Sequence, residues 1–243
     1  MFTQATGSER FTPLHLEWPE CRNARDVGGT PTLDGRRVRR GALIRSDGHE
    51  RLRADGVAAV RAYGVTRIID LRRVEECATM PSPFANDPCY RHISVHPEST
   101  PAPTLDGIYC AMLDRRPDLF AQAVGAIADA PPGGVVVHCV AGKDRTGLVV
   151  AFALHLAGAG LEAIAADYAL TDERLQQTYA EYLAAADPSD HARLRGLYRT
   201  PPEAMYAVFD HLASTYGGVD GYLERGGLTT SQVAALRARL LEE

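Results

Sequence analysis

Two residues six positions apart, Cys139 and Arg145, form the pair in this sequence with the clearest chemical use. Cys139 follows the apolar run VVVH, and the loop CVAGKDR then leads into an apolar stretch with helical character. A loop that ends at a helix N-terminus favours a thiolate, because backbone N–H groups and the positive end of the helix dipole face the sulfur. The same N–H groups can hold phosphate oxygens, and a guanidinium can bind two of them. The pattern predicts attack by Cys139 on a phosphate monoester.

The residues around this pair complete an anion-binding loop. Gly142 permits a tight turn. The hydroxyl group of Thr146 can donate a hydrogen bond to the Cys139 sulfur, which stabilises the sulfur first as a thiolate and later as a leaving group. His138 is expected to have a supporting role in fixing the end of the strand and the loop. The predicted substrate-binding residues are Val140, Ala141, Gly142, Lys143 and Thr146.

Lys143 is unusual because it is the single lysine among 26 basic residues, the other 25 being arginines. One reading is chance, since some position must hold the last lysine. The sharper reading is a compact ammonium that meets an anion. A second cation beside the phosphate predicts a preference for substrates with additional negative charge, such as phosphoinositides.

Departure of the leaving group requires a proton donor, and the same group can later activate water. Asp144 is the first candidate because it lies inside the loop. Cations on both sides would favour its ionised form, whereas a bound phosphate dianion would favour its protonated form. Asp70, at the end of a predicted parallel strand, is the second candidate, with a structural role as partner of Arg72 as the alternative.

Two further acidic positions are predicted to be structural. Trp18-Pro19-Glu20 is the one Trp-Pro sequence and lies more than a hundred residues before Cys139. We interpret it as an N-terminal anchor, and an acid-bearing loop is the alternative. Asp26 is expected to hold the turn that the following glycines permit.

The elements that must position these residues predict an α/β fold: a central, mostly parallel sheet flanked by helices, with a helical C-terminal portion. Predicted strands cover 42–45, 65–72, 90–95 and 135–137, and a hairpin turns at Asp34 and Gly35. Predicted helices cover 54–63, 117–130, 161–170, 172–185, 202–216 and 231–241, and a buried helix starts at Thr146.

No linker, repeat or low-complexity tract divides the chain, so residues 1–243 are predicted to form a single domain in which 161–243 are mostly helical. Leu175, Tyr179 and Tyr182 lie on one side of a predicted helix. This arrangement predicts a lid over about residues 171–200, with an ordinary core-facing stripe as the alternative.

Composition excludes several classes of protein and site. The net charge is -5 without a basic block, which argues against nucleic acid as a partner. Five cysteines without a CxxC pair argue against a zinc site and a disulfide framework, so neither metal nor cofactor is expected. No apolar run reaches the length of a membrane span. A cytoplasmic location is expected, with export by a signal-independent route left open, and no pattern specifies an oligomeric state.

The segment HCVAGKDRTG resembles the signature loop of the cysteine-dependent tyrosine phosphatase superfamily, most closely the bacterial protein tyrosine phosphatase B-like group. The segments RNARDVGG, GALIRSD, VTRIIDLR and YGGVDGYLERGGLTTSQVAALRARL are similar to that group in the same order. The resemblance implies a metal-free hydrolysis of phosphotyrosine in proteins, with dual-specificity or phosphoinositide activity as further expectations. It implies that Cys139 forms a phosphocysteine, that Arg145 stabilises the equatorial oxygens, and that Asp144 is the acid.

Two other functions use similar loops. A sulfurtransferase also has a loop cysteine, but its loop is usually shorter and lacks the RTG helix start. A phosphate-binding module without catalysis would normally have a substituted Cys139 or Arg145, and both residues are present.

Overall fold

A six-stranded sheet forms the centre of the computed structural model, which describes residues 13–95, 102 and 104–242. The strand order is β1-β2-β3-β6-β4-β5, in which β3, β6, β4 and β5 are parallel neighbours and β1 and β2 are antiparallel. This arrangement confirms the predicted α/β class. The strands are β1 Leu14–His15, β2 Arg25–Asp26, β3 Leu43–Ser46, β4 Val65–Asp70, β5 Tyr90–His92 and β6 Gly134–His138.

The parallel register brings the carboxyl ends of three strands to one edge of the sheet. His138, the last residue of β6, lies opposite Ser46 on β3 and Asp70 on β4. The loops that follow these strands therefore meet at the same place. In open α/β sheets this edge is where ligands usually bind.

Side-chain alternation along β6 divides the core between the two faces of the sheet. Val135 and Val137 belong to the larger apolar cluster, whereas Val136 belongs to the smaller one with Ile44 and Ile68. A strand that is buried on both faces has a continuous run of apolar residues, as β6 has in the segment VVVH.

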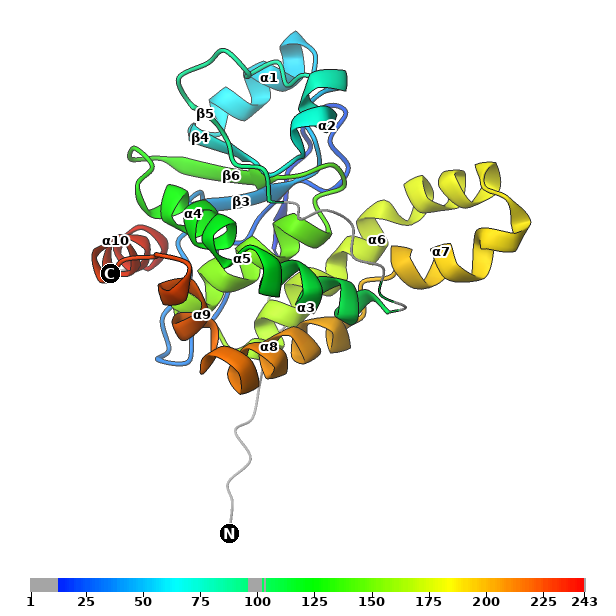
Figure 1. Cartoon of the computed structure of the whole chain (residues 1–243). Helices are drawn as coiled ribbons and strands as arrows, with labels where there is room; N and C mark the ends of the chain where they lie inside the picture. Colours follow the sequence, from blue (N-terminus) through cyan, green and yellow to red (C-terminus); the bar gives the residue numbers. More distant parts are fainter. Residues whose placement is uncertain (1–12, 96–101, 103, 243) are drawn as a thin grey trace.

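Helices cover both faces of the sheet (Figure 1). Helices α1 and α2 lie on one side, α4 and α5 lie on the other, and the distal half of α6 extends away from the sheet together with α7. The helices are α1 Ala54–Ala62, α2 Val74–Thr79, α3 Leu105–Arg115, α4 Pro117–Ala128, α5 Asp144–Leu156, α6 Leu161–Ala185, α7 His191–Tyr198, α8 Pro202–Tyr216, α9 Val219–Arg225 and α10 Thr230–Leu240, with a 3-10 turn at Pro188–Asp190.

Most predicted elements are present with boundaries shifted by a few residues, but one prediction is wrong. The expected separate helices 161–170 and 172–185 are one continuous helix, α6, because no glycine or proline separates them. Thr171 at the expected break is buried, and its hydroxyl oxygen accepts a hydrogen bond from Arg25. The buried helix starts at Asp144 instead of Thr146, and strand 90–95 ends at His92.

Four helices were not predicted from the sequence: α2, α3, α7 and α9. The hairpin is confirmed, since Gly35 has a φ of +87° and Asp34 accepts hydrogen bonds from Arg36. Asp26 is structural as predicted, because it accepts hydrogen bonds from the N–H groups of Gly28 and Gly41.

A buried ion-pair triad joins the sheet to α6. Asp167 on α6 accepts hydrogen bonds from Arg25 on β2 at 2.8 Å and from Arg45 on β3 at 2.5 Å, and all three residues are at most 1% exposed. Burial acts to raise the pKa of Asp167, but the two guanidinium groups hold it below its usual value. A carboxylate or guanidinium group that is buried without a partner destabilises the folded state. The triad therefore fixes the position of α6 relative to the sheet.

We expect Asp167→Asn to lower the free energy of unfolding by about 3 to 5 kcal/mol, because two guanidinium groups would remain buried without a counter-charge. Denaturant unfolding at pH 7 measures the loss, and the exposed neighbour Glu173→Gln is the control, with an expected change below about 0.5 kcal/mol. Because the pKa of Asp167 is lowered in the folded state, this stabilisation is present above the unfolded pKa of about 4 and is lost as the pH falls through the lower folded value. Equal stabilities of the Asp167 and Glu173 variants would contradict the structural role of the triad.

Candidate active site

The loop between β6 and α5, residues 139–143, is held by hydrogen bonds to its backbone carbonyl groups. The carbonyl of Val140 accepts from the N–H of Gly48 at 2.8 Å. The carbonyl of Ala141 accepts from the Asn23 side-chain amide at 2.9 Å, and that of Gly142 accepts from Arg45 at 2.8 Å. Each of these carbonyl groups therefore points to a partner outside the loop.

The N–H groups of residues 140–146 are left for a ligand. None of them donates a hydrogen bond to another residue in the described part of the chain. They lie where the N-terminus of α5 begins, with Lys143 as its N-cap. Such a set of N–H groups at a helix N-terminus binds anions, in agreement with the predicted phosphate site.

Gly142 is required by the shape of this loop. Its φ is +66°, and a Cβ atom would lie 2.4 Å from the carbonyl oxygen of Ser46 and 2.7 Å from the N–H nitrogen of Asp47. Only a residue without a side chain allows the loop to approach the end of β3 this closely.

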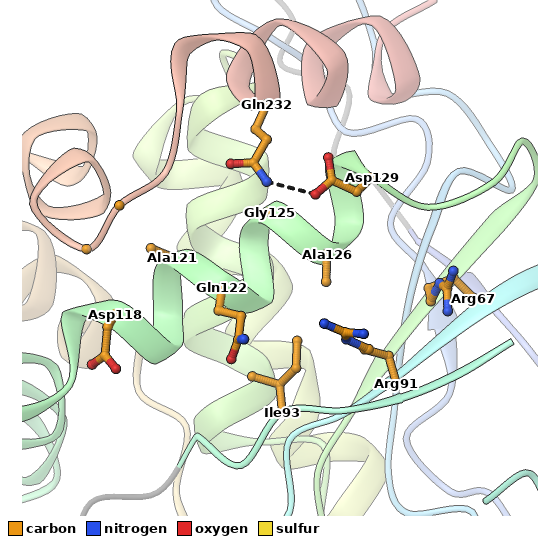
Figure 2. A pocket seen from close by; sticks show the side chains of 12 residues that line it. Arg67, Arg91, Ile93, Asp118, Ala121, Gln122, Gly125, Ala126, Asp129 and Gln232 are labelled. Atoms are coloured by element: carbon orange, nitrogen blue, oxygen red, sulfur yellow. Dashed lines mark hydrogen bonds between the residues drawn. The ribbon is translucent and has the colours of Figure 1, made fainter. Parts of the chain in front are cut away.

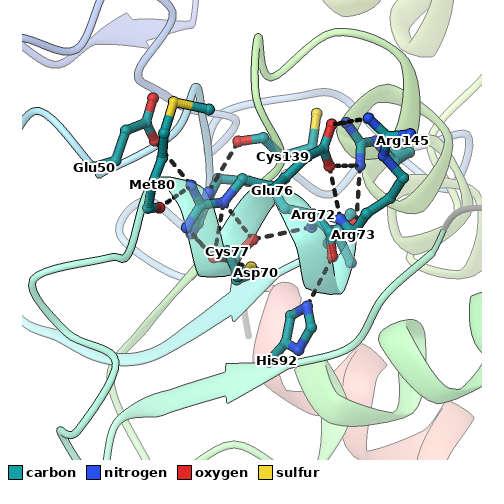
Figure 3. Close-up of polar contacts among 12 residues, drawn as sticks. Glu50, Asp70, Arg72, Arg73, Glu76, Cys77, Met80, His92, Cys139 and Arg145 are labelled. Carbon is teal, nitrogen blue, oxygen red and sulfur yellow. Dashed lines mark hydrogen bonds and ion pairs between the residues drawn. The ribbon is translucent and has the colours of Figure 1, made fainter.

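The structure brings Cys139 and Arg145 together at this edge of the sheet. Cys139 is 2% exposed, and Arg145 lies in the first turn of α5 with its guanidinium held by Glu76 of α2 at 2.7 Å (Figure 3). Burial works against the charge of Arg145, but the Cys139 thiolate and Glu76 raise its pKa above the ordinary value. In turn, although burial opposes ionisation, hydrogen bonds from Arg145 and the Arg73 N–H lower the pKa of Glu76 to about 2. The guanidinium is therefore charged and fixed beside the sulfur.

His138 and Asp70 lie beneath the loop. His138 has its Nδ1 3.1 Å from the carbonyl oxygen of Cys139, and its ring stacks on His49 with centroids 4.4 Å apart. Burial lowers the pKa of both histidines, so the pair is neutral at neutral pH. Asp70 is fully buried and pairs with Arg72 through two oxygens, with a further hydrogen bond from Tyr90 at 2.7 Å. These contacts favour the structural alternative for Asp70.

Asp144 and Lys143 have specific partners. Asp144, with a side chain 39% exposed, accepts a short hydrogen bond from Tyr109 and a second one from Lys143 at 3.0 Å, both through Oδ1. Lys143 is 2% exposed and also donates to the carbonyl oxygen of Leu197 at the end of α7, at 2.5 Å. The single lysine therefore connects the loop to α7 as well as facing the acidic residue.

Thr146 does not make the expected hydrogen bond to sulfur in this structure. Its hydroxyl oxygen is buried and has no hydrogen-bond partner among the described residues. Trp18 is the predicted anchor: it is 5% exposed and packs edge-on against His49 and Tyr63.

A hollow of about 170 Å³ opens beside the loop, where Val140 and Ala141 form one wall and Leu175 and Tyr179 of α6 form another. A separate hollow of about 420 Å³ is lined by α4, α10 and strands β4 and β5, with Arg67 and Arg91 contributed by the strands and Asp118 and Asp129 by the two ends of α4 (Figure 2). None of the predicted site residues lines this second hollow, whereas Val140 and Ala141 line the first, so the first hollow adjoins the candidate site.

Within the described residues, no group of three or more His, Cys, Asp and Glu side chains is placed to hold a metal ion. No helix in the same residues is long and apolar enough to cross a membrane.

Comparison with known proteins agrees with this geometry. A family model described as the tyrosine phosphatase family matches residues 16–242. The chain belongs to this family. The phosphatase is 32% identical over 217 residues to a tyrosine-protein phosphatase from Nostoc commune, a match that covers 82% of this chain and 74% of that protein. It is 30% identical over 277 residues to the triple specificity protein phosphatase PtpB from Mycobacterium tuberculosis, covering 93% and 98% of the two chains. The predicted family and enzyme class are confirmed.

Sequence reasoning missed several residues that surround the loop of this phosphatase: Asn23, Arg45, Glu76, Tyr109 and Tyr168. Two of them had a signal, since Asn23 and Arg45 lie in the segments RNARDVGG and GALIRSD. An arginine in an otherwise apolar strand indicates a buried partner. Glu76 and Tyr109 had none, because their helices were not predicted.

Glu76→Gln tests whether the ion pair positions the guanidinium of Arg145. A neutral amide holds a guanidinium less strongly than a carboxylate does, so we expect kcat/KM to fall about tenfold. Because the pKa of Glu76 is about 2, this effect should be constant across assays from about pH 5 to 8. The adjacent exposed Glu75→Gln is the control, and an equal decrease in both variants would show that α2 acts only through its overall charge.

Proposed function

We propose that this protein is a protein-tyrosine phosphatase that acts through a phosphocysteine formed on Cys139. The observation that supports this proposal is that the buried Cys139 begins a loop whose N–H groups have no partner in the described residues, with the charged Arg145 in the first turn of the helix that follows. A thiolate, an N–H cradle and a guanidinium are the groups that transfer of a phosphoryl group to cysteine requires.

In the first step, the Cys139 sulfur forms a bond to phosphorus while the bond from phosphorus to the leaving oxygen breaks. Asp144 transfers its proton to that oxygen, so the leaving group departs as a neutral alcohol or phenol. The loop N–H groups and Arg145 bind the equatorial oxygens, where negative charge is concentrated. In the second step, water attacks phosphorus, Asp144 takes its proton, and the thiolate leaves.

The substrate range that we propose includes phosphotyrosine in proteins, with dual specificity and phosphoinositides as further substrates. The relative from Mycobacterium tuberculosis is named a triple specificity phosphatase, which supports a broad range. The ammonium group of Lys143 donates a hydrogen bond to the carbonyl oxygen of Leu197. It would bind the additional charges of a polyanionic substrate if it left this carbonyl oxygen.

We also propose that residues 1–243 act as one domain, that the hollow beside the loop is the entrance to the site, and that about residues 171–200 form a lid over it. Tyr179 of α6 faces the hollow beside the loop and stacks on Tyr198 of α7 with ring centroids 4.5 Å apart. The buried Leu175 lines the same hollow, so the stripe serves both the core and the entrance.

We expect Cys139→Ser to abolish phosphate release from a phosphotyrosine peptide, a phosphoserine peptide and a phosphatidylinositol phosphate. A serine hydroxyl is a far weaker nucleophile than a thiolate, so the loss should exceed about a thousandfold. The native protein gives the ranking of the three substrates, and covalent labelling by ³²P-phosphate with burst kinetics identifies the phosphocysteine. Native protein that binds phosphate without turnover would instead indicate a binding module. Cyanide-dependent thiocyanate formation would indicate a sulfurtransferase.

We expect Lys143→Ala to reduce turnover of a phosphoinositide more than turnover of a phosphotyrosine peptide, by about a further fivefold to tenfold. The physical reason is the loss of one cation that can face additional phosphate groups. Arg199→Ala is the control, because its exposed guanidinium is near the same helix end but pairs with Asp172. Equal losses on both substrates would remove the hypothesis that Lys143 selects polyanionic ligands.

A further inference from the structure

We propose that Tyr109, supported by Tyr168, is a positioning residue that orients the carboxyl group of Asp144 for proton transfer. This inference rests on the proposed role of Asp144 as proton donor and acceptor. It assigns a role to two buried tyrosines whose helices, α3 and α6, are far from the loop in the sequence.

The contacts form a chain of three side chains from three helices. The hydroxyl group of Tyr109 donates a short hydrogen bond to Oδ1 of Asp144 and lies 2.6 Å from the hydroxyl of Tyr168. The two rings meet edge-on, with centroids 6.3 Å apart and planes at 84°. Tyr109 is fully buried and Tyr168 is 1% exposed, whereas the side chain of Asp144 is 39% exposed. The chain therefore runs from the interior to the partly exposed carboxyl group of Asp144.

The number of hydrogens on the two phenols fixes the direction of the chain. Each phenol has one O–H group. Because the hydrogen of Tyr109 goes to Asp144, the hydrogen of Tyr168 must go to the oxygen of Tyr109. Burial and the nearby charge of Asp144 raise the pKa of both tyrosines above the ordinary value, so both hydroxyl groups keep their hydrogens throughout the range of enzyme assays.

The two oxygens of Asp144 consequently have different surroundings. Oδ1 accepts from Tyr109 and from the ammonium of Lys143, whereas Oδ2 has no hydrogen-bond partner in the part of the chain that the structure describes. Because Oδ1 already accepts from two donors, a proton that Asp144 transfers would be carried on Oδ2. Both hydrogen bonds to Oδ1 can persist when Oδ2 is protonated, because a carboxylic acid keeps an acceptor oxygen. One fixed orientation then serves Asp144 as acid in the first step and as base in the second.

Tyr109→Phe removes the hydroxyl group and keeps the buried ring. We expect kcat/KM for phenyl phosphate, whose leaving group needs a proton, to fall about 10- to 100-fold. For 2,4-dinitrophenyl phosphate, whose leaving group is stable as an anion, we expect a decrease of less than about threefold. Tyr168→Phe should change the same ratio in the same direction, by about threefold to tenfold. The partly exposed Tyr206→Phe on α8 is the matched control and should leave the ratio unchanged.

The comparison of two leaving groups separates orientation of a proton donor from a structural role. A variant that only disturbs the loop loses activity on both substrates equally, and this result for Tyr109→Phe would overturn the inference. Asp144→Asn, measured in parallel, tests the proposed acid itself: if it does not increase the difference between the two substrates, the role of Asp144 fails. If Asp144→Asn does increase it and Tyr109→Phe does not, only the orienting role of Tyr109 fails.

Discussion

The site depends on the outward direction of the backbone carbonyl groups in the loop after Cys139. A peptide group has a donor on one side and an acceptor on the other, so a carbonyl that bonds outward leaves its loop free to present N–H groups inward. Here three successive carbonyl groups, those of Val140, Ala141 and Gly142, accept hydrogen bonds from outside the loop. The donors are the backbone N–H of Gly48, the side-chain amide of Asn23 and the guanidinium of Arg45. Without these donors, the buried carbonyl groups would lack hydrogen bonds or would turn toward the side of the loop that the N–H groups face.

The groups that hold the loop are themselves fixed by the core. Arg45 donates to the carbonyl of Gly142 with one nitrogen and to Asp167 with another, and Arg25 completes the triad while also donating to the side chain of Asn23. The geometry of the proposed anion site at the edge of the sheet is therefore set by the ion-pair triad in the interior. Catalytic groups held by locked neighbours keep their geometry when substrate arrives.

The charged groups at the site are also held by neighbouring side chains. The histidine pair beneath Cys139 is neutral, Arg145 is neutralised in part by Glu76, and Asp70 is paired with Arg72. Two cationic groups, Arg145 and Lys143, thus remain near the anion site with partners that define their orientation. Asp144 stands apart, since it alone among these acids combines an exposed side chain with buried donors.

The sequence by itself determined the fold class and the enzyme family, and it predicted the chemistry of the site. The apolar strand, the glycine and the cysteine-to-arginine spacing depend on local backbone geometry, so they could be recognised in one segment of the chain, as could the alternation of strands and helices. Tertiary structure decided which other side chains surround that segment. Glu76, Tyr109 and Tyr168 come from three separate helices, and contacts of this kind depend on packing that no local pattern encodes. It also showed that Lys143 is bonded to α7 and that Asp70 is buried in an ion pair. These are consequences of burial, where each charged group must find a partner, and only the folded chain defines what that partner is.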